Sequence, residues 1–238
     1  MTDSALISWT VLLPVKVLAR AKSRLAVLAG ERRRELALAL AADTVAAAAA
    51  CPEVARVLVI TSDAVAGPLL AALGAVTVPD EPWDQPAGPA SLDAAGLGVQ
   101  EALNAALRHG AAEAVRRWPG TGLAALTADL PALRPAELSA ALRRAGAAPG
   151  AASFVPDAAR VGTTLYAVPP GRTFQPLFGG ASRARHAASG ATELAGDDLT
   201  GLRRDVDTPD DLRAAIALGA GPRTTVLAGE LFADADRR

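Results

Sequence analysis

The chain has 238 residues, 51% of them hydrophobic, so it can bury one sizeable core and we expect a single domain. A formal net charge of −1 argues against nucleic acid or an anionic membrane surface as a partner, which leaves a small molecule as the expected ligand. The single cysteine, Cys51, excludes an internal disulfide and a cysteine-cluster metal site. No early stretch has the pattern of a secretory signal, so we expect a cytoplasmic protein.

Apolar runs bounded by turn residues alternate along the chain with segments of helical period. This alternation predicts an α/β fold with a mixed, mostly parallel sheet flanked by helices. The expected strands are residues 10–15, 56–60, 75–78, 122–127, 151–154, 163–168 and 202–206. The expected helices are residues 31–50, 64–73, 98–108, 135–145, 183–189 and 209–218.

Two regions of the chain are not expected to form elements of the core. Residues 79–98 hold four prolines and predict a long loop, a feature that is often functional in a compact domain. Residues 220–238 are polar at their end, and we expect this tail to fray beyond a domain of residues 1–219.

The only two lysines of the chain, Lys16 and Lys22, lie six residues apart directly after the first expected strand. Arginine takes every other cationic position, so a need for ammonium groups is indicated here. A strand, a cationic loop and a helix form the arrangement in which an α/β fold holds phosphates. Chance placement of two lysines on a solvated loop remains the alternative.

Acidic residues follow two other expected strands. Asp129 comes directly after residues 122–127, at the carboxyl end of a strand, where open α/β sheets bind ligands. Asp205 and Asp207 lie two apart in extended chain, so they project the same way. Mg2+ prefers a few carboxylates plus phosphate oxygens, and these strand ends could supply them. For Asp210 and Asp211, an ordinary helix cap is the favoured interpretation.

A third group of residues carries hydroxyls and glycines. Residues 162–166 open a strand with two threonines, and residues 178–182 read Phe-Gly-Gly-Ala-Ser before an expected helix. A glycine turn that leads into a helix presents backbone N–H groups to an anion, and Ser182 adds a hydroxyl. Ser182 could instead serve only as the helix cap. His186 has no cysteine or histidine partner nearby, so we do not expect it to bind metal.

Taken together and in this order, the motifs resemble the CofC/FbiD family of guanylyltransferases, which act in the biosynthesis of coenzyme F-420. The resemblance runs from about residue 12 to residue 212 and implies a Rossmann-like nucleotidyltransferase fold. The family joins GMP from GTP to 2-phospho-L-lactate or phosphoenolpyruvate. The motifs are Pro-Val-Lys-x5-Lys-Ser-Arg-Leu (14–25), Leu-Asn-Ala-Ala-Leu (103–107), Thr-Ala-Asp-Leu-Pro (127–131), Gly-Thr-Thr-Leu (162–165), Phe-Gly-x-x-Ser (178–182) and Asp-Val-Asp-Thr-Pro-x-Asp-Leu (205–212).

The resemblance also implies roles for individual residues, with Lys22, Asp129 and Asp205 as the catalytic set. The nucleotide would be bound by Lys16, Arg20, Lys22, Arg24 and Asn104, with residues 91–98 beside it. Mg2+ would be held by Asp129, Asp205 and Asp207, and the small acid by Thr164, Gly179 and Ser182. The loop of residues 80–98 is longer and richer in proline than the family pattern, so the guanine contacts transfer least securely.

The charges of the two substrates suggest the mechanism. A phosphate oxygen of the acceptor attacks the α-phosphorus of GTP, and neutralisation of two polyanions supplies most of the catalysis without a protein nucleophile. The alternatives are another nucleotidyltransferase of this fold, using CTP or a sugar phosphate, and a non-catalytic nucleotide-binding protein. The acceptor stays open among phosphoenolpyruvate, 2-phospho-L-lactate and phosphoglycerate, and so does the oligomeric state, a homo-oligomer included.

Overall fold

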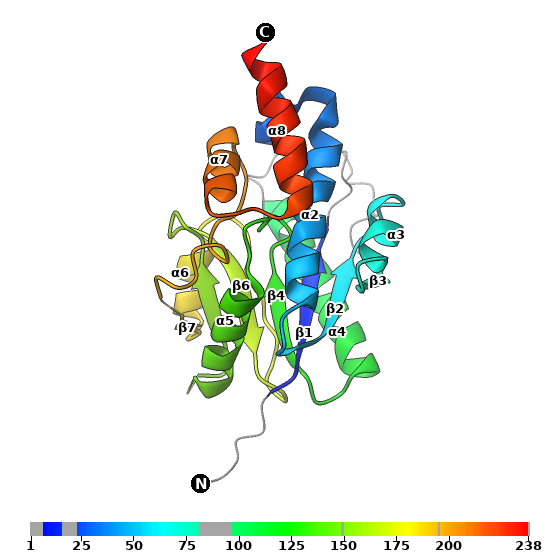
Figure 1. Ribbon diagram of the computed structural model, residues 1–238. Coiled ribbons are helices and arrows are strands. Elements are labelled where there is room, and N and C mark those ends of the chain that lie inside the picture. Colours follow the sequence, from blue (N-terminus) through cyan, green and yellow to red (C-terminus); the bar gives the residue numbers. More distant parts are fainter. Residues whose placement is uncertain (1–6, 16–22, 81–96, 149, 195, 238) are drawn as a thin grey trace.

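The computed structural model describes residues 7–15, 23–80, 97–148, 150–194 and 196–237. A seven-stranded sheet crosses the molecule in the order β3-β2-β1-β4-β6-β5-β7 (Figure 1). All strands run parallel except β6, which is antiparallel to both of its neighbours. The mixed, mostly parallel sheet is therefore confirmed. The strands are β1 (Trp9–Pro14), β2 (Val54–Ile60), β3 (Val76–Val78), β4 (Gly122–Leu126), β5 (Ser153–Pro156), β6 (Thr163–Val168) and β7 (Thr192–Glu193).

Eight α-helices and two 3-10 turns occupy the rest of the described chain. Among these residues, no helix has the length and apolar character that a membrane span requires. The helices are α1 (Ala26–Ala29), α2 (Arg33–Ala49), α3 (Ala66–Ala71), α4 (Leu97–Arg117), α5 (Pro135–Ala147), α6 (Ser182–Ala188), α7 (Pro209–Ala217) and α8 (Pro222–Asp236), and the 3-10 turns are η2 (Ser23–Leu25) and η3 (Gly30–Arg32).

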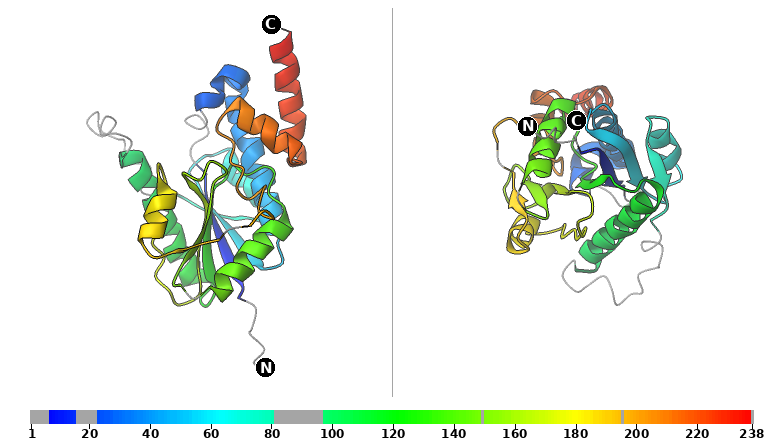
Figure 2. Two further views of the ribbon diagram at one scale, coloured as in Figure 1. Left: turned by 90° about the vertical axis from the view of Figure 1, so that its left-hand side faces the viewer. Right: turned by 90° about the horizontal axis from the view of Figure 1, so that it is seen from below.

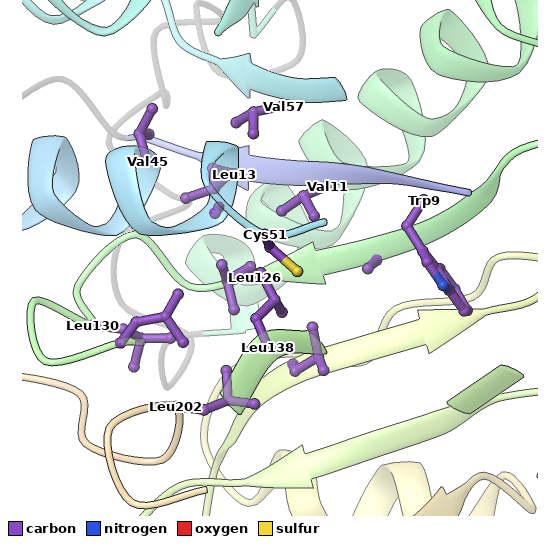
Figure 3. Close-up of a cluster of buried hydrophobic side chains, with 14 of the residues drawn as sticks. Trp9, Val11, Leu13, Val45, Cys51, Val57, Leu126, Leu130, Leu138 and Leu202 are labelled. Atoms are coloured by element: carbon purple, nitrogen blue, oxygen red, sulfur yellow. The ribbon is translucent and has the colours of Figure 1, made fainter. Parts of the chain in front are cut away.

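The two faces of the sheet are covered by different helices (Figure 2). Successive side chains of a strand point to opposite faces, and β1 shows this directly. Val11 and Leu13 pack with α2, α3 and α5, whereas Leu12 packs with α4. Cys51 is buried in the first of these clusters (Figure 3), and burial raises the pKa of its thiol to about 11. Cys51 is therefore a core residue with no thiolate chemistry near neutral pH.

Helix α4 is longer than the expected helix of residues 98–108 because Gly110 does not end it. A Cβ on Gly110 would lie 2.5 Å from Cδ1 of Ile60, a distance that side chains do not adopt. The glycine thus permits α4 to pack closely on β2, although glycine in a helix interior costs about 1 kcal/mol relative to alanine.

The strand expected at residues 202–206 is wrong. The last strand is β7, at Thr192–Glu193, and it pairs with β5. The backbone groups of the expected strand bond elsewhere: Leu202 N–H donates to the Glu137 carboxylate and Val206 N–H to the Asp129 carbonyl. Leu202 and Val206 are two buried apolar residues in a short polar stretch, and this pattern is also typical of a strand. Among the described residues, no strand pairs with this segment.

The expected fraying after Gly219 is also wrong, because Pro222–Asp236 forms α8 along α2 (Figure 1). Thr224, Leu227, Ala228 and Leu231 are buried in a regular helical spacing with a proline in the first turn. Asp43 of α2 is buried and accepts the Thr224 N–H at 2.7 Å, so it caps α8 from another helix.

Candidate active site

The acidic site forms where two distant segments meet at the carboxyl end of β4. Val206 N–H donates to the carbonyl of Asp129 at 3.1 Å. This single backbone bond places Asp205 and Asp207, on either side of Val206, next to Asp129. The two acidic segments expected to act together are thus adjacent in the structure.

Thr44 of α2 hydrogen-bonds the backbone of the Asp129 segment. Sequence reasoning did not identify this residue. Leu130 N–H donates to the Thr44 hydroxyl at 3.0 Å, and that hydroxyl donates to the carbonyl of Leu40 at 2.8 Å. Thr44 is fully buried, so its hydroxyl is committed to these two bonds. Since Leu130 directly follows Asp129, Thr44 fixes the direction of the carboxylate-bearing turn.

A second support that sequence reasoning missed is Glu137 of α5. Its buried carboxylate accepts the N–H groups of Leu202 at 2.8 Å and Gly201 at 3.2 Å. A Cβ on Gly201 would collide with the carbonyl oxygen of Ala132, so only glycine permits this close approach. Glu137 therefore anchors the turn that leads into Asp205.

The segment after Asp207 is a helix cap, as expected for Asp211. Thr208 accepts the Asp211 N–H at 3.2 Å, and the Asp211 carboxylate accepts the Thr208 N–H at 2.9 Å, which completes a capping box for α7. Asp210 takes no part in this cap and pairs with Arg213 on the surface. The capping role thus belongs to Thr208 and Asp211.

The three residues expected to bind metal are Asp129, Asp205 and Asp207. Within the described ranges, no group of three or more Asp, Glu, His or Cys side chains is close enough to hold a metal ion. Mg2+, however, is usually bound by one or two carboxylates together with waters and substrate phosphates. Adjacent turns carrying Asp129 and Asp205 fit such a site, in which the nucleotide supplies the remaining oxygens.

The hydroxyl-bearing start of β6 lies at the same edge, because β6 runs antiparallel to β4. Thr127 N–H donates to the carbonyl of Thr164 at 3.0 Å, directly beside the Asp129 turn. Thr164 itself is buried, and its hydroxyl lies 3.4 Å from the carbonyl oxygen of Val155. Thr164 is therefore positioned by the sheet and borders the acidic site.

The glycine turn of residues 178–182 adopts a conformation suited to anions. Gly179 and Gly180 have φ angles of +96° and +43°, which other residues rarely adopt. Ser182 is the first residue of α6, is buried and caps nothing, because the N-cap position falls on Ala181. Among the described residues, the N–H groups of Gly179, Gly180 and Ala181 have no hydrogen-bond acceptor. Consecutive N–H groups of this kind form an anion-binding nest.

His186 joins the glycine turn to the start of β6. Its Nε2 accepts the Leu177 N–H at 3.0 Å, so Nδ1 carries the proton and donates to the Thr163 hydroxyl at 2.9 Å. The ring stacks on Tyr166 with centroids 4.7 Å apart and also contacts Phe154 and Phe178. Both nitrogens are occupied, which agrees with the expectation that His186 does not bind metal.

Burial and, to a smaller extent, the nearby Arg185 guanidinium lower the pKa of His186 from 6.5 to about 4. The folded state therefore keeps the ring neutral, while the unfolded chain takes up a proton between these values. We expect the stability that His186 contributes to be complete above about pH 6.5 and to be lost as the pH falls towards 4. Urea unfolding at pH 7 and pH 4.5 checks this expectation.

The comparison for this experiment is His186→Gln. The stability difference between wild type and His186→Gln should shrink on acidification. A difference for His186→Gln that is the same at both pH values would contradict the neutral, buried imidazole.

The expected cationic loop is only partly described. Lys16, Arg20 and Lys22 lie outside the described residues, as does most of the expected loop of residues 80–98. Arg24 is exposed in η2, which follows the end of β1, and Leu25 beside it is fully buried. Leu25 packs in one cluster with Ala132 and Val206, so the helical segment after the lysines is anchored beside the acidic site. Asn104 of α4 bonds to the backbone of Phe178 at the glycine turn.

Solved structures show which proteins share this fold. The chain is similar to a putative nucleotide-diphospho-sugar transferase from Desulfovibrio desulfuricans G20, with a TM-score of 0.65 and 16% identity over 95% of this chain and 96% of the other. It is also similar to a nucleotidyl transferase from a Methanothermobacter species, with a TM-score of 0.51 and 20% identity over 89% and 97% of the two chains. The fold is that of the nucleotidyltransferases.

Sequence relatives identify the family to which the chain belongs. No family model matches the chain. A phosphoenolpyruvate guanylyltransferase from Thermomonospora curvata is 57% identical over 97% of this chain and 92% of the relative. The enzyme of the same name from Streptomyces coelicolor is 54% identical over 94% of this chain and 97% of the relative. The chain belongs to the phosphoenolpyruvate guanylyltransferase family and is a nucleotidyltransferase.

Proposed function

We propose that this enzyme transfers GMP from GTP to the phosphate of a small phosphorylated carboxylic acid and releases pyrophosphate, as a step of coenzyme F-420 biosynthesis. Phosphoenolpyruvate is the favoured acceptor because the relatives bear its name, and 2-phospho-L-lactate is the second candidate. The observation that carries the proposal is the Val206-to-Asp129 backbone bond, which joins two acidic segments beside the start of β6.

The reaction forms a bond from an acceptor phosphate oxygen to the α-phosphorus of GTP and breaks the bond from that phosphorus to the bridging oxygen. Both reactants are polyanions, so positioning and charge neutralisation are the main demands. The N–H groups of Gly179, Gly180 and Ala181, which have no acceptor among the described residues, suit the anionic groups of the acceptor. Ser182 and Thr164 are assigned to the acceptor by the family resemblance, and both side chains are buried in this structure. Lys16, Arg20, Lys22 and Arg24 would bind the triphosphate.

Mg2+ is the cofactor that we propose for this site. Asp129 and Asp205 would hold it, with Asp207 beside them, and the ion would supply positive charge to neutralise the phosphates. The protein has to keep these carboxylates in place. Thr44 positions Asp129 through the Leu130 N–H, and Glu137 positions Asp205 through the Leu202 N–H. No protein nucleophile is required, and Cys51 and His186 are both buried and committed to the fold.

The test is incubation of the purified protein with GTP, Mg2+ and one acceptor at a time, followed by mass analysis and pyrophosphate detection. Phosphoenolpyruvate, 2-phospho-L-lactate and 3-phosphoglycerate are compared, and CTP replaces GTP in a parallel set. We expect a guanylylated acid to form with phosphoenolpyruvate and one pyrophosphate to be released per product. Turnover with CTP alone, or nucleotide binding without any turnover, would overturn the proposal in favour of a different nucleotidyltransferase or a non-catalytic binding protein.

A further inference from the structure

Asn104 was expected to contact the nucleotide, but its side chain is engaged by the glycine turn. Its Oδ1 accepts the Phe178 N–H at 2.8 Å, and its Nδ2 donates to the Phe178 carbonyl at 3.2 Å. Nδ2 also donates to the carbonyl of Gln100, one turn earlier in α4, at 2.9 Å. The Asn104 side-chain amide thus bonds both the N–H and the carbonyl of Phe178, which lies 74 positions away.

This engagement leaves little of Asn104 for a ligand. The residue is 6% exposed, and each of its amide atoms already has a protein partner. A nucleotide contact would require Asn104 to give up the Phe178 backbone, whose buried N–H and carbonyl would then lose their partner. Such a loss is costly in a protein interior.

Two residues of α6 hold the same backbone from the other side. The Arg185 guanidinium donates to the carbonyls of Leu177, Phe178 and Gly179, and His186 accepts the Leu177 N–H. The backbone N–H and carbonyl groups of residues 177 and 178 therefore already have hydrogen-bond partners on α4 and α6. Among the described residues, the next three N–H groups, those of Gly179 to Ala181, have no acceptor and can bind an anion.

The first turns of α4 also shape this arrangement sterically. A Cβ on Gly179 would collide with the side chain of Gln100, and one on Gly180 would lie 3.2 Å from its Nε2. Gln100 Oε1 in turn accepts from Arg185 at 3.3 Å. Gln100 and Asn104, one turn apart on α4, thus both contact the glycine turn of residues 178–182.

We propose that Asn104 is a positioning residue that holds the Phe178–Ser182 turn in its anion-binding conformation and so sets the affinity for the acceptor acid, not for the nucleotide. This inference rests on the proposed function for the identity of the anion. Asn104 acts through Phe178 and touches neither reactant.

The experiment compares Asn104→Ala, the nearly isosteric Asn104→Asp and, as a matched control on α4, Arg108→Ala. An ionised aspartate can still accept the Phe178 N–H but cannot donate to the carbonyls of Phe178 and Gln100, so it removes both donated bonds without opening a cavity. Arg108 is exposed and pairs only with Glu101 on the helix surface among the described residues. Melting temperature and circular dichroism establish that each variant is folded.

The first readout is hydrogen exchange of the Leu177 and Ser182 amides, which flank the turn and donate to His186 Nε2 and to the Gly180 carbonyl, in the protein without substrates. We expect exchange to be at least about 10-fold faster in both Asn104 variants and unchanged in Arg108→Ala. The second readout is steady-state kinetics, where the acceptor KM should rise by about 10-fold or more while the KM for GTP stays within about 2-fold.

Unchanged exchange in folded Asn104 variants, or a rise in the KM for GTP with no change for the acceptor, would overturn the proposal and restore the nucleotide role. If the wild-type protein shows no turnover with GTP and any acceptor, the proposed function fails instead. Exchange of the Leu177 and Ser182 amides then still decides whether Asn104 positions the turn, since that measurement needs no substrate. If Asn104→Ala does not fold, Asn104→Asp carries both readouts.

Discussion

Asp129→Asn and Asp205→Asn are each expected to reduce Mg2+-dependent turnover by about 100-fold or more while the protein stays folded. Asparagine keeps the size of the side chain but removes the charge that would hold the ion. The backbone bond between Asp129 and Val206 does not involve either carboxylate, so the local fold should persist. Steady-state kinetics with a titration of Mg2+ measures the loss.

The double variant gives a sharper test. Residues that act as one unit are not additive, so Asp129→Asn with Asp205→Asn should lose little more than either single change. Melting temperatures should be nearly unchanged, because asparagine keeps the size of the side chain and the backbone bond from Val206 to Asp129 stays in place. Asp210→Asn is the matched control, since Asp210 is exposed and pairs with Arg213. Near-full turnover of either single variant with Mg2+ would show that the two aspartates share no ion.

Lys22→Ala is expected to lower kcat/KM for GTP by about 100-fold, because we assign its ammonium to the phosphates. Lys22→Arg should also be impaired, since a planar guanidinium does not reproduce a compact point charge. Lys22 lies outside the described residues, and this prediction rests on the sequence and on the family to which the chain belongs.

The controls for Lys22 are Arg143→Ala and Arg213→Ala, which remove surface cations that pair with Glu53 and Asp210. The Arg213–Asp210 pair is exposed, and pairs of this kind contribute about 0–1 kcal/mol to stability. Arg143 is exposed but its partner Glu53 is largely buried, so the melting temperature of Arg143→Ala is measured before its activity is compared. Equal, modest losses in all three variants would remove the argument that the two lysines are kept for phosphate binding.

Most elements were predictable because their signals are local. Strands β1, β2, β4 and β6 are short apolar runs bounded by turn residues, and α5 and α7 each begin at a proline that suits a first helical turn. Errors arose where a local signal had two meanings. Leu202 with Val206 indicated a strand but anchors a turn, and α4 continues beyond its expected end at residue 108 through Gly110, which serves close packing.

Helix α8 was missed although its sequence carries the signal. Leu227, Ala228 and Leu231 have helical spacing after a first-turn proline, while the charged residues near the end of the chain suggested a tail. The cap that stabilises its first turn comes from Asp43, about 180 residues earlier. No inspection of neighbouring residues could identify that partner.

By itself, the sequence determined the α/β class, the order of most elements and the motifs that mark the family, because these depend on residues close together in the chain. Only the tertiary structure decided how the motifs cooperate. Thr44 holds the Asp129 turn, Glu137 holds the Asp205 turn, and Asn104 binds the Phe178 backbone in the glycine turn. These bonds join residues separated by more than 60 positions, and they exist because the helices pack on opposite faces of one sheet and bring buried polar groups within reach of unpaired backbone.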